Sequence, residues 1–221
     1  MLILPEARLV VLETPKTGSQ ALRKMLAAHL GRLDPSPPRH LRADLYARRW
    51  ADLVERRWGA GFESLAVMRA PLERMQSWFR YRRREKLVGG GRSTGELSFA
   101  RFMEGYLSDP QPEVARIGRQ DRFLAWDGER LGVDHLFDYA QLPRLSAFIE
   151  ARLSAARGAK RQRPLVLAQR NVSPRLEPTE DYALPLALLQ RYHRQNAAEF
   201  ALYEEVSKAG HWHGPAGGGA V

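Results

Sequence analysis

Two short runs of aliphatic residues, each followed by a loop and an amphipathic stretch, dominate the first third of the chain. Residues 8–13 form the first run, and apolar positions recur at helical spacing from Ser19 towards Gly31, which predicts a buried strand, a tight loop and a helix. Residues 62–68 form the second run, and Pro71 suits the first turn of the helix after it. Two such units predict a parallel sheet covered by helices, with a ligand site at the carboxyl ends of the strands.

The rest of the chain continues this alternation. The pattern predicts a helix over residues 98–106, a strand over 135–139, a helix over 142–153 and a closing helix over 184–208. No repeat and no second-domain boundary is apparent, so we expect a single domain over residues 1–208. The glycine-rich end of the sequence predicts a flexible tail over residues 209–221. The expected fold is three-layer α/β, with a mostly parallel central sheet flanked by helices.

The composition is that of a globular protein. Apolar residues make up 44% and charged residues 27% of the 221 positions, which argues against a wholly disordered chain. Cysteine is absent, which excludes disulfides, thiolate catalysis, iron–sulfur clusters and cysteine zinc sites. The sequence opens without a basic leader and contains no run of about 18 apolar residues, so we expect a cytoplasmic protein without a transmembrane segment.

The charge of the chain narrows the classes of partner. There are 35 Lys and Arg residues against 25 Asp and Glu residues, a formal net charge of +10. Such an excess of positive charge attracts anions, including phosphate esters, nucleic acid, acidic sugars and anionic lipid. The sign of the charge alone does not identify which of these anions the protein binds. A high arginine content without functional meaning is the alternative interpretation.

The loop between the first strand and the first helix suits an anion. Residues 15–20 read Pro-Lys-Thr-Gly-Ser-Gln, so backbone N–H groups at a helix start, a lysine and two hydroxyls would converge on one ligand. The lysine precedes a single glycine, and the nucleotide-triphosphatase pattern Gly-x-x-x-x-Gly-Lys-Ser/Thr is not present. We therefore predict a phosphate-binding loop, with an ordinary strand-to-helix turn as the alternative.

Two segments together resemble a known enzyme family. Residues 15–19 (Pro-Lys-Thr-Gly-Ser) and residues 69–77 (Arg-Ala-Pro-Leu-Glu-Arg-Met-Gln-Ser), each after a strand, resemble sulfotransferases that use 3′-phosphoadenosine-5′-phosphosulfate (PAPS), especially the carbohydrate-sulfating branch. The resemblance implies a P-loop-kinase-like fold, PAPS as co-substrate and no metal. It assigns the 5′-phosphosulfate to the first loop and the 3′-phosphate to the second segment. The residues thereby assigned to PAPS are Lys16, Thr17, Gly18, Ser19, Gln20, Arg69 and Ser77.

Sulfuryl transfer needs a cation for the charge growing on the leaving phosphate and a base for the proton of the acceptor hydroxyl. The resemblance gives Lys16 the first role. His40 is the candidate base, because several carbohydrate sulfotransferases use a histidine in this stretch and histidine titrates near neutrality. Glu13 is the reserve candidate, and a surface position without function is the alternative for His40. His211 and His213 lack further placed ligands, so no metal site is predicted.

The resemblance implies a carbohydrate or glycoconjugate hydroxyl as acceptor. Gln120 and residues 171–173 match further landmarks of the branch, whereas residues 198–200 (Ala-Glu-Phe) depart from its usual Asp-Phe pair. One alternative is a nucleotide kinase or triphosphatase, which would need a Walker lysine and magnesium-binding residues. Another is a nucleic-acid-binding module, which would place stacking aromatics among its basic residues. Most aromatics here fall on apolar helix faces, so we expect no nucleic-acid partner, and the sequence assigns no oligomeric state.

Overall fold

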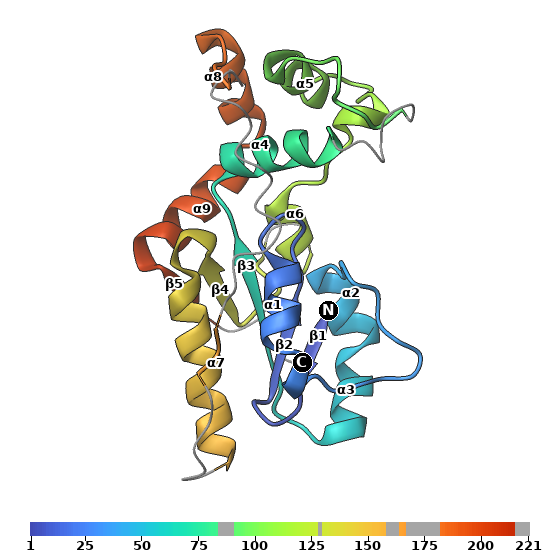
Figure 1. The fold of residues 1–221 in the computed structure, drawn as a ribbon, viewed down its shortest axis with the longest axis vertical. Coiled ribbons are helices and arrows are strands. Elements are labelled where there is room, and N and C mark those ends of the chain that lie inside the picture. The colour runs from blue at the N-terminus through green and yellow to red at the C-terminus, as the bar shows by residue number, and fades with distance from the viewer. Residues whose placement is uncertain (84–90, 128–129, 158–163, 167–181, 215–221) are drawn as a thin grey trace.

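A mixed sheet of five strands forms the centre of the fold, which Figure 1 shows as a computed structural model. The structure describes residues 1–83, 91–127, 130–157, 164–166 and 182–214, so residues 171–173 lie outside the described residues. The strands lie side by side in chain order: β1 (Leu2–Leu4), β2 (Leu9–Leu12), β3 (Glu63–Met68), β4 (His135–Asp138) and β5 (His211–His213). β2, β3 and β4 are parallel, whereas β1 and β5 pair antiparallel at the two edges. The predicted α/β class and parallel centre are confirmed, and the antiparallel edges correct the expectation of a mostly parallel sheet.

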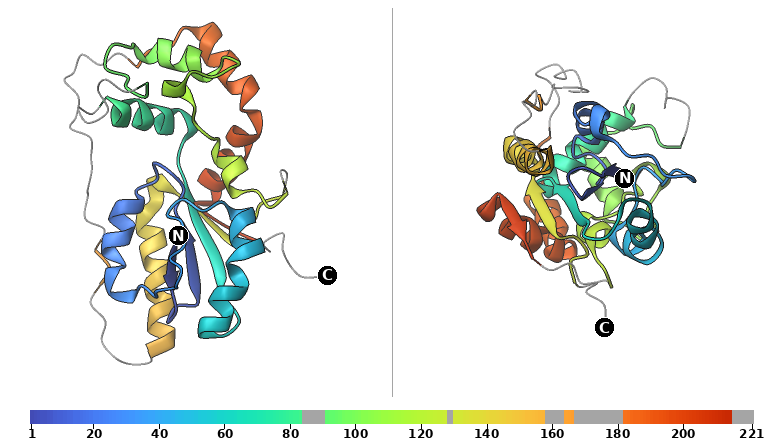
Figure 2. Two further views of the ribbon diagram at one scale, coloured as in Figure 1. Left: turned by 90° about the vertical axis from the view of Figure 1, so that its right-hand side faces the viewer. Right: turned by 90° about the horizontal axis from the view of Figure 1, so that it is seen from below.

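Helices cover both faces of the sheet and so make three layers (Figure 2). The α-helices are α1 (Ser19–Met25), α2 (Ala43–Arg49), α3 (Ala51–Trp58), α4 (Pro71–Arg82), α5 (Phe99–Tyr106), α6 (Gln120–Leu124), α7 (Leu142–Arg157), α8 (Leu186–Gln195) and α9 (Ala197–Ala209). Leu9 and Val11 of β2 belong to one buried cluster with α1 and α7, and Val10 and Leu12 belong to another with α2, α3 and α9. Because successive strand residues point to opposite faces, a short aliphatic strand is buried on both sides.

A third apolar cluster lies beyond the carboxyl ends of the parallel strands, where α4, α5 and α8 pack together (Figures 1 and 2). The ring centroid of Phe79 lies 5.5 Å from those of Phe99 and Phe102. Pro71 begins α4, and the Ser98 hydroxyl caps α5 by accepting from the Arg101 N–H at 3.2 Å, as the sequence predicts. This helical layer holds the first turns of α4 above the edge of the sheet at which a ligand site is expected.

The closing helix is divided in two. α8 and α9 replace the single helix predicted over residues 184–208, and the break falls at Asn196. The Asn196 side chain donates to the Tyr192 carbonyl at 2.9 Å and accepts from the Tyr106 hydroxyl at 3.0 Å. An asparagine that hydrogen-bonds the backbone of the preceding turn competes with helix continuation, and the buried tyrosine stabilises that arrangement.

Part of the predicted tail is ordered, which corrects the boundary placed at residue 209. Ala209 ends α9, and His211–His213 form β5 against β4. The pairing satisfies backbone groups that would otherwise stand at the open edge of β4. Residues 215–221 lie outside the described residues. Among the described helices, the longest has 16 residues, and none has the length and apolar content to cross a membrane.

Candidate functional site

The loop after β2 and the first turns of α4 border one cavity of about 330 Å³. Because β2 and β3 are parallel neighbours, the segments that follow them leave the sheet at the same edge. The cavity is lined by Pro15, Lys16, Gly18, Ser19, Gln20, Arg39, His40, Arg69, Ser77, Trp78, Tyr81 and Tyr139. Every residue that the sequence assigned to PAPS or to catalysis is therefore at this cavity, except Thr17 and the reserve candidate base Glu13.

The backbone of the loop explains the positions of its lysine and its glycine. Gly18 has φ of 79°, and a Cβ there would lie 3.2 Å from a ring carbon of Tyr139, so the turn requires glycine. Lys16 has φ of 72°, a left-handed conformation that costs a residue with a side chain roughly 1 kcal/mol or more and is frequent at functional sites. Its Nζ lies 4.3 Å from the ring centroid of Tyr81 and 5.6 Å from that of Trp78. Two aromatic faces on α4 thus hold the ammonium group at the cavity.

The hydroxyl of Thr17 does not take part in the cavity. Thr17 is buried, and its Oγ1 donates to the carbonyl of Thr14 at 2.8 Å. The predicted convergence of two hydroxyls is therefore wrong for this side chain, because the turn after β2 uses it to satisfy a buried carbonyl. The hydroxyl of Ser19, by contrast, lines the cavity and accepts a hydrogen bond from Arg39 at 3.2 Å. Since α1 has only seven residues, side-chain cations supply more of the positive field than its dipole does.

Arg69 and Ser77 meet at the cavity from the end of β3 and from the second turn of α4. The Arg69 guanidinium lies 4.5 Å from the ring centroid of Tyr139, and its Nε is 3.3 Å from a carboxylate oxygen of Glu73. Within the described part of the chain, neither terminal nitrogen of Arg69 has a partner. These two nitrogens and the Ser77 hydroxyl are the donors that a phosphate group requires.

Arg39 is a further cation at the cavity, and the sequence interpretation missed it. Its guanidinium donates to the Ser19 hydroxyl, and its Nε lies 3.6 Å from Glu13. The residue follows a proline-rich connection, where nothing in the pattern separates it from the other basic residues of the chain. Only the fold of this connection, back across the start of α1, brings it to the site.

His40 is held in a defined tautomer. Its Nδ1 lies 2.7 Å from the backbone oxygen of Glu13. A carbonyl oxygen can only accept, so Nδ1 carries the proton, and the neutral ring presents Nε2 as a proton acceptor. The Glu13 carboxylate, by contrast, is buried, does not line the cavity, and contacts Arg23 at 2.5 Å and Arg39 at 3.6 Å. The geometry therefore favours His40 over Glu13 as the candidate base.

Three buried side chains behind the cavity join its two loops. Arg74 donates to the carbonyl of Pro15 at 3.3 Å, and Gln120 exchanges hydrogen bonds of 3.0 and 2.9 Å with the backbone of Arg69. Glu199 accepts from the backbone and side-chain amides of Gln120 at 2.9 and 3.0 Å, and lies 3.6 Å from Arg74. Burial lowers the pKa of Arg74, and Glu199 opposes that effect.

Arg74 and Glu199 have structural positions in this network. Arg74 does not line the cavity, and its hydrogen bond to the Pro15 carbonyl ties the Lys16 loop to α4. Glu199 belongs to the segment that departs from the resembled family, and no local pattern marks it as a partner of Gln120, 79 residues away along the chain. This network can be recognised only from the tertiary structure, which brings α4, α6 and α9 together.

The cavity suits an anionic ligand. Lys16, Arg39 and Arg69 contribute to the lining, and among the described lining residues there is no Asp or Glu. Three aromatic side chains complete the wall and offer flat apolar surfaces. Within the described residues, no group of three or more His, Asp or Glu side chains is placed to hold a metal ion. His211 and His213 belong to β5, in the edge pairing with β4.

Comparison with protein-family models, with curated proteins and with solved structures finds no match for this chain. A function for the protein therefore has to follow from the cavity and from the two segments that border it.

Proposed function

We propose that the protein is a PAPS-dependent sulfotransferase of P-loop-kinase-like fold, which acts on a hydroxyl of a carbohydrate or glycoconjugate. The observation that carries the proposal is the meeting of three segments at one cavity: the loop that bears Lys16, the Arg69–Ser77 segment, and His40. PAPS is anionic at both its 5′-phosphosulfate and its 3′-phosphate. A cavity with three cations and no carboxylate among its described lining residues has the donors that both groups require.

Each segment has a separate task in this proposal. PAPS, when bound, supplies the sulfuryl group that passes to the acceptor oxygen. Lys16 stabilises the negative charge that grows on the 5′-phosphate oxygen as its bond to sulfur breaks. Arg69 and Ser77 bind the 3′-phosphate and so orient the nucleotide without touching the reacting atoms. The aromatic side chains of the wall provide surfaces for the adenine ring.

His40 activates the acceptor. Its Nε2 removes the proton of the acceptor hydroxyl as the new oxygen–sulfur bond forms, while the electron pair of the broken bond leaves with the 5′-phosphate. The hydrogen bond from Nδ1 to the carbonyl of Glu13 keeps Nε2 free for this proton and stabilises the imidazolium that results. The same hydrogen bond fixes the orientation of the ring beside the Lys16 loop.

The cavity gives less support to the two alternatives. A nucleotide kinase or triphosphatase needs a carboxylate ligand for magnesium besides its hydroxyl ligand, and the described lining contains no carboxylate. A nucleic-acid-binding module needs a groove along which a phosphate backbone runs, whereas these cations share a cavity of about 330 Å³.

Isothermal titration with adenosine 3′,5′-bisphosphate and with 5′-AMP tests the proposal. The wild-type protein is expected to bind the bisphosphate more tightly, because only the bisphosphate contacts Arg69 and Ser77. Arg69→Ala should weaken the bisphosphate about 30-fold, since a charge-assisted hydrogen-bond pair contributes about 2 kcal/mol, and should leave 5′-AMP nearly unchanged. A transfer assay with labelled PAPS and a panel of sugar acceptors then measures the reaction itself.

Arg101→Ala is the matched control, because Arg101 is an exposed arginine of α5 whose side chain contacts Glu104 and lies outside the cavity. It should bind both nucleotides like the wild type. A wild-type protein that binds both nucleotides equally, or that prefers ATP with magnesium, would refute the assignment of the 3′-phosphate and the proposed function with it.

A further inference from the structure

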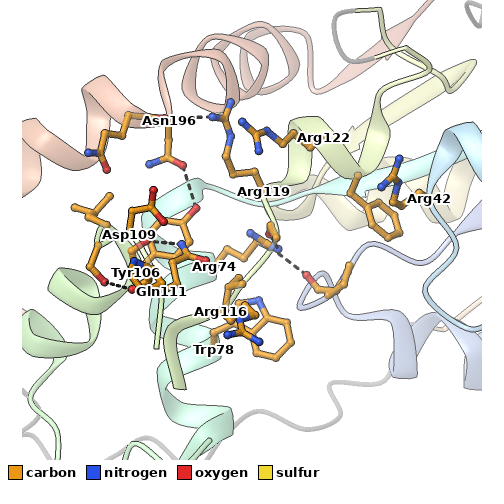
Figure 3. A pocket seen from close by; sticks show the side chains of 18 residues that line it. Arg42, Arg74, Trp78, Tyr106, Asp109, Gln111, Arg116, Arg119, Arg122 and Asn196 are labelled. Atoms are coloured by element: carbon orange, nitrogen blue, oxygen red, sulfur yellow. Dashed lines mark hydrogen bonds between the residues drawn. The ribbon is translucent and has the colours of Figure 1, made fainter. Parts of the chain in front are cut away.

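A second and larger cavity, of about 890 Å³, is shown in Figure 3. Its volume lies within the range of small-molecule sites, roughly 300–1,000 Å³. The third apolar cluster and the segment before α6 form most of its wall, and Figure 3 shows arginine side chains on several sides of it. The arginines that line it are Arg42, Arg74, Arg116, Arg119 and Arg122, and Asp109 is the single carboxylate among the described lining residues.

Three of these arginines are neutralised by the protein itself. Arg42 contacts Asp44 at 2.6 Å, Arg119 contacts Asp121 through two hydrogen bonds, and Arg74 lies 3.6 Å from Glu199. Their guanidinium groups therefore form part of the wall but are less available to a ligand, since each already has a carboxylate partner.

Arg116 and Arg122 differ from the other three. No side chain or carbonyl in the described part of the chain accepts a hydrogen bond from either guanidinium, and both residues are exposed. Asp109 lines the same cavity without forming an ion pair with them. Two guanidinium groups with their donors unused, on the wall of one cavity, are suited to bind carboxylate, sulfate or phosphate groups.

The second cavity lies beside the proposed reaction centre. Pro15 and Trp78 line both cavities, so the two share a wall. His40 lines the first and Arg42 the second, two residues further along the chain. A molecule in the second cavity would therefore lie next to the cavity that contains His40.

We propose that the second cavity is the acceptor site and that the acceptor is an acidic sugar, whose carboxylate or sulfate group contacts Arg116 and Arg122. The inference rests on the proposed function and extends it by naming the class of acceptor. Trp78 provides a flat apolar surface for the sugar between the two charged regions.

Two glycosides that differ in one group test this inference. 4-Nitrophenyl β-D-glucuronide carries a carboxylate where 4-nitrophenyl β-D-glucoside carries a hydroxymethyl group. Ligand-observed NMR titration in the presence of saturating adenosine 3′,5′-bisphosphate measures the dissociation constant of each. The wild-type protein should bind the glucuronide about tenfold more tightly, as expected for charge-assisted contacts that remain partly exposed to water.

The variant Arg116→Gln/Arg122→Gln should bind both glycosides equally and should keep wild-type affinity for adenosine 3′,5′-bisphosphate. Arg56→Gln/Arg57→Gln is the matched control, because it removes the same charge from exposed positions of α3 that line neither cavity. This control should retain the preference for the glucuronide, which separates a local contact from an effect of net charge.

The outcomes separate this inference from the proposed function. Equal binding of the two glycosides by the wild type, or a preference that survives in Arg116→Gln/Arg122→Gln, would overturn the acidic-acceptor site. Failure of adenosine 3′,5′-bisphosphate to bind, with the glucuronide preference intact, would overturn the sulfotransferase proposal and leave an anion-binding cavity. Sulfuryl transfer to the glucuronide with the preference intact would support both.

Discussion

The buried carboxylate of Glu199 provides the sharpest test of how the site is held together. Glu199→Ala removes both hydrogen bonds to Gln120 and the carboxylate that forms the ion pair with the buried guanidinium of Arg74. Glu199→Gln keeps an oxygen that can accept from Gln120 but removes the charge. The two variants therefore separate the loss of a hydrogen-bond acceptor from the loss of an ion pair.

The expected magnitude follows from burial. Breaking a buried ion pair by removing one partner costs about 3–5 kcal/mol, because the remaining charge stays uncompensated in a poorly solvated place. Arg74 keeps its hydrogen bonds to the carbonyls of Pro15 and Gly118, so Glu199→Ala should fall at the lower end, about 3 kcal/mol. For a domain of this size that corresponds to a fall in Tm of about 6–12 °C. Glu199→Gln also leaves the charge of Arg74 uncompensated, but its amide oxygen still accepts from Gln120, so it should cost about 1 kcal/mol less than Glu199→Ala.

Urea denaturation and thermal unfolding measure these differences, and nucleotide binding supplies a second readout. Gln120 hydrogen-bonds both backbone groups of Arg69, so Glu199→Ala should also weaken adenosine 3′,5′-bisphosphate more than 5′-AMP. The double variant Arg74→Met/Glu199→Leu is the control: it removes both charges and should be more stable than Glu199→Ala.

A loss of less than about 1 kcal/mol in Glu199→Ala would show that the pair does not behave as a buried ion pair. Equal losses in Glu199→Ala and Glu199→Gln would show that the hydrogen bonds to Gln120 contribute nothing beyond the charge, so that Glu199 does not link α9 to the Arg69 segment. A double variant less stable than Glu199→Ala would show that the two residues contribute independently. Any of these results would refute the proposed coupling between α9 and the two loops.

Three further predictions concern single residues. Lys16→Ala and Lys16→Gly should both lower turnover by two to three orders of magnitude, as the loss of a transition-state donor does. In urea denaturation Lys16→Gly should be the more stable of the two variants by about 1 kcal/mol, because glycine accepts a φ of 72° without strain. Equal stability of the two variants would argue against the left-handed backbone. His40→Ala should abolish transfer and leave the titration of adenosine 3′,5′-bisphosphate unchanged, since a base touches the acceptor only; a variant as active as the wild type would remove His40 from the mechanism. Burial, and then the neighbouring His135, lower the pKa of His211 to about 4. Between pH 6.5 and 4 this histidine is therefore protonated in the unfolded chain but not in the folded chain, so the urea midpoint should fall as the pH falls, and should fall less in His211→Phe. A wild-type midpoint that stays constant over this range would contradict the prediction.

Local patterns predicted the elements that border the first cavity. The aliphatic runs that became β2 and β3, and the proline that begins α4, are determined by strand burial and by the missing N–H of proline, both of which are local properties. The meeting of the two loops was also predictable, because parallel neighbouring strands end at the same edge of a sheet.

Edges and long-range contacts were not predictable in this way. β1 and β5 have three residues each, too few for a periodic signal, and they form only because β2 and β4 offer open backbone groups. The break at Asn196 depends on the Tyr106 hydroxyl, 90 residues earlier in the chain. No window of sequence contains both partners.

The sequence by itself was enough to predict residues that line the first cavity: Lys16 in a loop that needs glycine, Arg69 and Ser77 eight positions apart, and a histidine in the connection between them. Only the tertiary structure decided how those groups are presented. It turned the Thr17 hydroxyl inward, selected the His40 tautomer through the carbonyl of Glu13, and left two arginines of a second cavity unpaired. The reason is physical: residue type and spacing are local quantities, whereas hydrogen-bond satisfaction, burial and charge pairing depend on which distant segments the fold brings together.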